Sequence, residues 1–306
     1  MTAVTVAVGA DPAAWIQAYL PDIRDRLVAD GVVRLSGAAV RSADDVAAAG
    51  DALFAAGCPR LEPFAARPDG AGRVAAAPVW PAERDMCPHN EQAHASVFPR
   101  TLLLAMPEGA GTDGATLLAD GAAVWRELDT PIRDRLAEQG WMLVRNYRPY
   151  VGMRWTEALG VTDPAEVVAH CAAAGVTASW AGATLHTRQR RPAFRTHPLT
   201  GVPCWFNLIC FLSQWSLRDE EREVLLGAYG PEGLPFNTFF GDGTPIAQPE
   251  WAHLQAVVDA YTVRQRWTPG DLLIVDNIRT SHGRTAHDGT WPLLEMQGDR
   301  DQHASE

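Results

Sequence analysis

The sequence has little positive charge and no run of basic residues that could follow a nucleic-acid backbone. Lysine and arginine together number 26, against 37 aspartates and glutamates, so the formal net charge is −11. Binding to nucleic acid depends mainly on contacts between cationic side chains and phosphates. We therefore expect no nucleic-acid partner.

Long apolar runs are also lacking. No segment approaches the roughly 20 apolar residues that a membrane-spanning helix needs. Residues 1–6 have neither the charged start nor the hydrophobic stretch of a signal peptide. These features predict a cytoplasmic protein that does not contact a membrane.

Cysteines are few and widely spaced, at positions 58, 87, 171, 204 and 210, with no Cys-x-x-Cys pair. This pattern argues against a disulfide framework or a structural zinc site. Cys87 lies two residues before His89, and we interpret it as a packing residue rather than a ligand. The 306 residues are enough for a substantial core. We expect a single domain over residues 1–306.

Periodicity and capping residues predict the secondary structure. Asp11 can cap a first helix that ends at Gly31, and Ser42 with Asp45 resembles a capping box. The further helices are expected at 43–56, 122–128, 130–139, 164–174, 218–228 and 251–264. Strands are expected at 32–35, 100–106, 116–120, 141–147, 183–186, 202–212 and 272–275.

Two segments are expected to lack regular structure. Residues 63–88 are rich in proline, alanine and glycine, which indicates a long loop or lid, and residues 299–306 are expected to form a disordered tail. Short strands scattered between helices, without regular alternation, favour an α+β protein built on an antiparallel β-sandwich with flanking helices. Double-sheet rolls of this kind have an open end where residues from distant strands converge.

The segment His89-Asn90-Glu91 is a candidate half of a metal site. In an extended segment, residues two apart point to the same side, so His89 and Glu91 can contact one ion. His282 lies in the loop after the strand at 272–275 and can complete the set. Two imidazoles and one carboxylate form the facial triad of non-haem Fe(II) oxygenases. On its own, a His-x-Glu pair is also compatible with a loop histidine beside a solvated glutamate.

Further motifs follow these residues in a fixed order, and together they carry a family resemblance. From roughly residue 85 to 296 the chain resembles the taurine dioxygenase-like (TauD/TfdA) family of Fe(II)- and 2-oxoglutarate-dependent oxygenases, in the natural-product hydroxylase branch related to clavaminate synthase. The matching segments are His89-Asn90-Glu91, Gly114-Ala115-Thr116, Val144-Arg145-Asn146-Tyr147, His197-Pro198-Leu199-Thr200-Gly201, Trp205-Phe206-Asn207, Phe240-Gly241-Asp242-Gly243-Thr244-Pro245-Ile246, Gly270-Asp271, Asp276-Asn277 and His282-Gly283-Arg284.

The resemblance implies a double-stranded β-helix, also called a jelly-roll or cupin-like sandwich. It implies that His89, Glu91 and His282 bind Fe(II), and that Thr116 and Arg284 belong to the binding site for 2-oxoglutarate. The implied reaction couples oxidation of 2-oxoglutarate to hydroxylation or desaturation at an unactivated carbon. Related halogenases have a small residue at the position of Glu91. The implied substrate is an amino acid or related small metabolite, free or attached to a carrier protein.

One expected residue is missing. In this family an arginine usually follows the distal histidine by about nine to fifteen residues and forks onto the far carboxylate of 2-oxoglutarate. Residues 291–297 contain no arginine and instead include an acid. Arg284, Arg300 or Arg145 could take its place. Two alternatives remain open: an iron oxidase on the same scaffold that does not use 2-oxoglutarate, and a sandwich protein that binds a small ligand without catalysis.

Other polar residues receive simpler interpretations. His94 is expected in the pocket wall or at the surface, with a spare metal ligand as the alternative. His287 is expected to be exposed, and His197 is expected to form structural hydrogen bonds. The basic residues 188–191, with Arg195, are interpreted as a solvated turn, with contact to an anionic substrate as the alternative.

Overall fold

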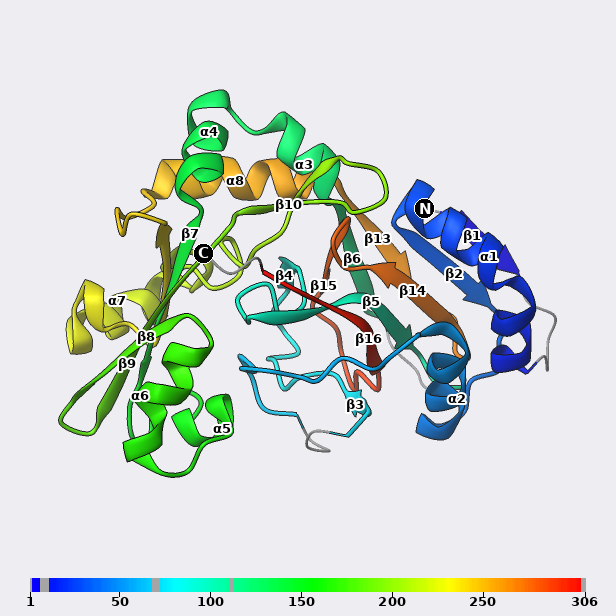
Figure 1. Ribbon diagram of the computed structural model, residues 1–306, viewed down its shortest axis with the longest axis horizontal. Helices are drawn as coiled ribbons and strands as arrows, with labels where there is room; N and C mark the ends of the chain where they lie inside the picture. The colour runs from blue at the N-terminus through cyan, green and yellow to red at the C-terminus, as the bar shows by residue number, and fades with distance from the viewer. Residues whose placement is uncertain (1, 6–10, 68–71, 110–112, 304–306) are drawn as a thin grey trace.

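The computed structural model describes residues 2–5, 11–67, 72–109 and 113–303 (Figure 1). Two sheets form its centre, and all their strand pairs are antiparallel except β1 with β2. The first sheet has the order β1 (Thr2–Thr5), β2 (Val32–Ser36), β14 (Leu272–Asp276), β5 (Val97–Ala105), β16 (Leu294–Gln302) and β3 (Val74–Ala76). The second has the order β13 (Thr262–Arg266), β6 (Ala115–Asp120), β15 (Thr280–Arg284) and β4 (Met86–His89).

The central strands of the first sheet are apolar on both faces because both faces are covered. On the inner face, Leu104 and Leu273 pack with Leu118 of β6, which joins the two sheets. On the outer face, Leu103 and Ile274 pack against the N-terminal helices. Strands buried on both sides read as continuous hydrophobic runs, which explains why β5 and β14 could be predicted.

The N-terminal helices α1 (Pro12–Asp30) and α2 (Ala43–Leu53) begin where the sequence predicted. Asp11 accepts the backbone N–H of Ala13 at 2.9 Å, and α1 ends at Gly31, whose φ of 76° is a left-handed conformation that favours glycine. Ser42 and Asp45 form the predicted capping box of α2. Both helices cover the outer face of the first sheet, at the blue end of the chain in Figure 1.

A third sheet lies on the other side of the molecule, close to α5 and α6 (Figure 1). Its strand order is β12 (Phe236–Phe240), β7 (Trp141–Tyr147), β9 (Thr184–Arg191) and β8 (Val176–Ala181). A smaller pair joins β10 (Phe194–Thr196) to β11 (Pro203–Trp205). The other helices are α3 (Gly121–Glu127), α4 (Thr130–Gln139), α5 (Trp155–Leu159), α6 (Pro164–Ala173), η1 (Gln214–Ser216), α7 (Asp219–Tyr229), η2 (Pro231–Gly233) and α8 (Gln248–Ala260).

Five predictions of secondary structure were wrong. His282, expected in a loop, lies in the strand β15. The expected strand at 202–212 stops after β11. Residues 206–212 form turns whose apolar side chains pack in the largest core cluster, and Phe211 stacks on His89 with 4.4 Å between ring centroids. The helix expected to reach 264 ends with α8, and β13 follows it. The expected loop at 63–88 contains β3 and begins β4. The expected tail is ordered through residue 303, since β16 pairs with β5 along its length; residues 304–306 lie outside the described part.

The architecture is the predicted α+β sandwich with flanking helices. Within the described residues, no helix combines the length and apolar character that crossing a membrane requires. The single-domain organisation stays a prediction.

Candidate active site

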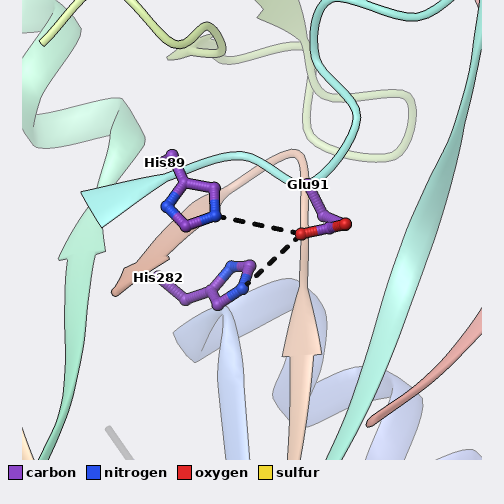
Figure 2. Close-up of side chains that lie close together, drawn as sticks. All are labelled: His89, Glu91 and His282. Atoms are coloured by element: carbon purple, nitrogen blue, oxygen red, sulfur yellow. Dashed lines mark ion pairs between the residues drawn. The ribbon is translucent and has the colours of Figure 1, made fainter. Parts of the chain in front are cut away.

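The three predicted ligands meet where β4 pairs with β15. His89 is the last residue of β4, and it lies opposite His282 of β15 in the antiparallel register. The turn after β4 then brings the carboxylate of Glu91 towards both imidazoles (Figure 2). A single strand pairing therefore joins residues that are far apart in the sequence.

The donor atoms converge closely enough to hold one ion. One ligand atom from each of the three residues lies within 4.8 Å of the others. Nε2 of His89 and Nε2 of His282 are each 3.9 Å from Oε2 of Glu91. His89 is 2% exposed, His282 is 9% exposed and Glu91 is 6% exposed. Two imidazoles and one carboxylate suit Fe(II) and leave other coordination positions open, so these residues fit that ion.

Asn277, directly after β14, fixes the turn that carries Glu91. Its side-chain oxygen accepts the backbone N–H of Glu91 at 2.8 Å, and its amide donates to the backbone carbonyl of Glu91 at 3.0 Å. Asn90 donates to the backbone carbonyl of Asn277 at 2.7 Å. All three residues are buried, so this network fixes the backbone position from which the side chain of Glu91 extends.

Burial sets the protonation of the ligands. Together with a smaller contribution from the neighbouring His282, it lowers the pKa of His89 to about 4. Burial also lowers the pKa of His282. It raises the pKa of Glu91, and the nearby carboxylate of Glu295 raises it too. Both imidazoles are therefore neutral at neutral pH, which is their ligand form. A bound cation would compensate for the cost of a buried Glu91 charge.

Behind Glu91 lies a buried network that the sequence did not predict. Gln297 of β16 donates from Nε2 to Oε1 of Glu91 at 3.1 Å and to Oε1 of Glu295 at 2.7 Å. Nη2 of Arg67 is 3.7 Å from Oε1 of Glu91 and 3.2 Å from Oε2 of Glu295. Burial opposes the charge of Glu295, but Arg67 and Arg60 outweigh it and lower the pKa of Glu295 to about 2. Glu295 is therefore ionised at neutral pH.

Thr116 and Arg284 line the same cavity as the three ligands. Trp291, Leu293 and Glu295 also line this cavity. The hydroxyl of Thr116 accepts the indole N–H of Trp267 at 2.9 Å. Arg284 donates to the backbone carbonyls of residues 80, 81 and 84, and its guanidinium faces the ring of Trp291 at 5.9 Å. A hydroxyl and a guanidinium thus stand beside the ligands, and Nη1 and Nη2 of Arg284 each donate to two backbone carbonyls.

The structure separates the candidates for the missing arginine. Arg300 is exposed near the end of β16, and Arg145 donates to the backbone carbonyl of Pro63, so neither lines this cavity. Arg284 does line it. The strand expected to carry the missing arginine is β16, which instead carries Glu295. This glutamate pairs with Arg67 from the segment between α2 and β3.

A second cavity opens on the other side of His89 and Glu91. Its wall includes Arg60, Phe64, Arg67, His94 and Leu208. The ring of Phe64 meets His89 edge-on at 5.5 Å between ring centroids. A larger open cavity of about 1140 Å³ shares Arg60 and Arg67 and is bounded on its far side by α5. Residues 60–67 therefore form a wall between the ligands and this larger space.

The other polar residues are resolved as follows. His94 lines the second cavity, as one of its two interpretations required. His197 forms the predicted structural hydrogen bond, from Nε2 to Oδ2 of Asp276 at 2.8 Å. The prediction that His287 is exposed was wrong, because its ring is buried and stacks on Trp291. The solvated turn at 188–191 was also wrong, because these residues belong to β9 and Arg191 is buried.

The jelly-roll sandwich with its facial His-Glu-His cluster defines an iron-dependent oxygenase scaffold, and the comparisons with known proteins agree. Residues 3–298 match the family described as "Taurine catabolism dioxygenase TauD, TfdA family", and the chain belongs to this family. A solved structure from Burkholderia xenovorans, assigned as an alpha-ketoglutarate-dependent taurine dioxygenase, shares the fold. It has a TM-score of 0.50 and 15% identity over 100% of this chain and 98% of that one.

Three curated relatives are similar to parts of the chain. The dapdiamide synthesis protein DdaC of Enterobacter agglomerans is 30% identical over 69% of this chain and 64% of its own. An alpha-ketoglutarate-dependent sulfate ester dioxygenase of Pseudomonas putida is 26% identical over 67% of this chain and 56% of its own. Clavaminate synthase 2 of Streptomyces clavuligerus is 48% identical over 21% of each chain. The chain thus spans less than two thirds of the length of each relative. The predicted TauD/TfdA family is confirmed, and the match to clavaminate synthase 2 is limited to 67 residues.

Proposed function

We propose that this protein is an Fe(II)- and 2-oxoglutarate-dependent oxygenase that hydroxylates an amino acid or a related small metabolite, free or carrier-bound, in a biosynthetic pathway. The observation that carries the proposal is the convergence of His89, Glu91 and His282 within 4.8 Å beside a cavity lined by Thr116 and Arg284. Members of the TauD, TfdA family, to which the chain belongs, use this metal and this cosubstrate.

In this proposal each residue has a defined task. His89, Glu91 and His282 hold Fe(II) from one side. Thr116 and Arg284 would hold 2-oxoglutarate, with the hydroxyl of Thr116 donating to one of its carboxylates. When bound, Fe(II) with 2-oxoglutarate and dioxygen supplies an oxidant that can hydroxylate an unactivated carbon while the keto acid becomes succinate and carbon dioxide.

The second cavity is our candidate for the substrate side. It borders His89 and Glu91 and carries both apolar and charged walls, which suits a small metabolite that must be held and aimed. Charges of both signs, from Arg60, Glu62 and Arg67, line the larger cavity beyond it. An amino acid carries both complementary charges. The names of DdaC and clavaminate synthase, both synthesis proteins, support a biosynthetic role.

The test is a coupled assay. Protein loaded anaerobically with Fe(II) is given oxygen, 2-oxoglutarate and a panel of amino acids and their amides, and succinate and hydroxylated product are measured. We expect both to form in equal amounts with at least one compound, and neither to form in His282→Ala. Oxygen uptake that persists at the same rate without the keto acid would instead support the oxidase that does not use 2-oxoglutarate.

A further inference from the structure

The two oxygens of the Glu91 carboxylate have different surroundings. Oε2 faces the imidazoles of His89 and His282, at 3.9 Å from each Nε2. Oε1 faces away from them and accepts a hydrogen bond from Nε2 of Gln297 at 3.1 Å, with Nη2 of Arg67 at 3.7 Å. One oxygen is therefore directed at the position for the ion, and the other is held by the protein.

Gln297 is placed for this contact by its strand. In β16, alternate residues face the inside of the sandwich, so Glu295 and Gln297 point inward while Met296 packs with the outer helices. Gln297 is 2% exposed. Its buried side chain can move little, and it lies directly beside the ligand set.

The neighbours of Gln297 also determine which way its amide points. Its nitrogen donates to two carboxylates, those of Glu91 and Glu295, whereas its oxygen has no hydrogen-bond partner among the described residues. The reverse orientation would turn the amide oxygen towards two acids and leave both without this donor. Two acceptors in front of one NH₂ group therefore fix the amide as a bridge.

We propose that Gln297 is a positioning residue for the metal ligand Glu91. Its amide immobilises Oε1 and so presents Oε2 to the ion beside the two imidazoles. The same bridge holds Glu295, whose charge Arg67 and Arg60 neutralise, at a defined distance from Glu91. This role rests on the proposed function only in requiring that Fe(II) binds to the three ligands.

The expected effect appears in the affinity for the metal. Loss of a partner that orients a metal ligand commonly weakens metal binding about 10- to 100-fold. We expect Gln297→Leu, which keeps the approximate size but removes both donors, to weaken Fe(II) binding by an amount in this range. Gln297→Asn keeps the amide but shortens the side chain by one carbon, so it should weaken binding as well.

The experiment is an anaerobic Fe(II) titration of the metal-free full-length protein, without cosubstrate or substrate. The matched control is Gln302→Leu, the same change at an exposed position of the same strand, which should bind Fe(II) as wild type does. Urea unfolding of each metal-free variant is measured in parallel. A structural role alone predicts lower stability with unchanged affinity, whereas the positioning role predicts weaker binding in protein that remains folded.

The outcomes separate this inference from the proposed function. If wild type binds Fe(II) and Gln297→Leu binds it equally well, the positioning role is wrong and the function stands. If Gln297→Leu does not fold, the titration of Gln297→Asn decides in the same way. If wild type itself fails to bind Fe(II), the proposed function is wrong, and the positioning role falls with it.

Discussion

Arg67 and Glu295 form a buried ion pair, 3.2 Å long, whose side chains are 9% and 4% exposed. Arg67 lies in the segment between α2 and β3, and Glu295 lies on β16, so the pair attaches this segment to the sandwich next to Glu91. Arg67 also donates to the backbone carbonyl of Ala76 at 2.8 Å. The wall formed by residues 60–67, which borders both the second cavity and the larger open cavity, is therefore held in place by this ion pair.

Removing one partner of this pair should destabilise the protein more than removing both. Arg67→Met leaves Glu295 buried with less compensation, and we expect a loss of about 3 kcal/mol in the free energy of unfolding. Arg67→Met combined with Glu295→Gln should recover most of that loss. The measurement is urea unfolding of the metal-free variants.

A surface ion pair provides the control for this prediction. Arg41 and Glu108 are 2.8 Å apart but largely exposed, so Arg41→Met should have a much smaller effect, because water and salt screen such pairs. Equal losses in the Arg67 and Arg41 variants, or no recovery in the double variant, would show that burial does not make the Arg67–Glu295 pair important.

Thr116 should contribute to cosubstrate binding through its hydroxyl hydrogen. Its oxygen already accepts the indole N–H of Trp267, so the hydrogen is available to a carboxylate. Thr116→Val should raise the KM for 2-oxoglutarate about tenfold, the value of one hydrogen bond to a charged group, with little change in Fe(II) affinity. Trp267→Phe removes the indole N–H and leaves the hydroxyl, and it should raise KM much less. An unchanged KM in Thr116→Val would remove Thr116 from the cosubstrate site.

Asn277 should support both folding and metal binding. Asn277→Ala leaves the backbone N–H of Glu91 and the carbonyl of Pro99 without their partners, since both bond to this side chain. We expect a loss of about 2–3 kcal/mol in unfolding free energy, together with weaker Fe(II) binding. Asn237 is a buried asparagine on β12 that accepts two backbone N–H groups away from the ligands. Asn237→Ala should lower stability without changing Fe(II) affinity, and equal affinities in both variants would contradict the assigned role of Asn277.

His303 should make stability depend on pH. Burial, together with the nearby charges of Arg195 and Arg191, lowers its pKa to about 3, so the folded protein keeps this imidazole neutral. The unfolded chain takes up a proton near pH 6.5. The stability that wild type has over His303→Phe should therefore be largest above pH 6.5. It should fall by about 1.4 kcal/mol per pH unit below that value, down to the folded pKa. Urea unfolding of both proteins at pH 7.5 and 5.0 measures this, and an unchanged difference would contradict the neutral buried state.

The candidate ligands could be singled out from the sequence because a local spacing agreed with an ordered family resemblance that runs from His89 to His282. His89 and Glu91 share two-residue spacing in an extended segment, and His282 follows a strand that is apolar on both faces. The capping residues Asp11 and Ser42 gave the starts of α1 and α2 from local signals alone. Each of these local signals needs only a few neighbouring residues.

The surroundings of Glu91 could not be predicted, for two physical reasons. β16 has the sequence LEMQGDRDQ, whose charged residues suggest a solvated tail, yet pairing with β5 turns Glu295 and Gln297 inward. Arg67 reaches Glu295 across 228 positions of sequence, and no local pattern reports such a contact. Likewise, β13 has the sequence TVRQR, which is mostly polar. It lacks the regular alternation of apolar and polar residues that would have separated this strand from the end of α8.

The most direct test of the account is an anaerobic absorption spectrum of the Fe(II)-loaded protein before and after addition of 2-oxoglutarate. Chelation of Fe(II) by the keto acid produces a weak visible band, which tests the metal and the cosubstrate together. We predict that the band forms in wild type and is absent in His282→Ala. Wild-type protein that holds Fe(II) at these residues but forms no band at saturating 2-oxoglutarate would contradict the account.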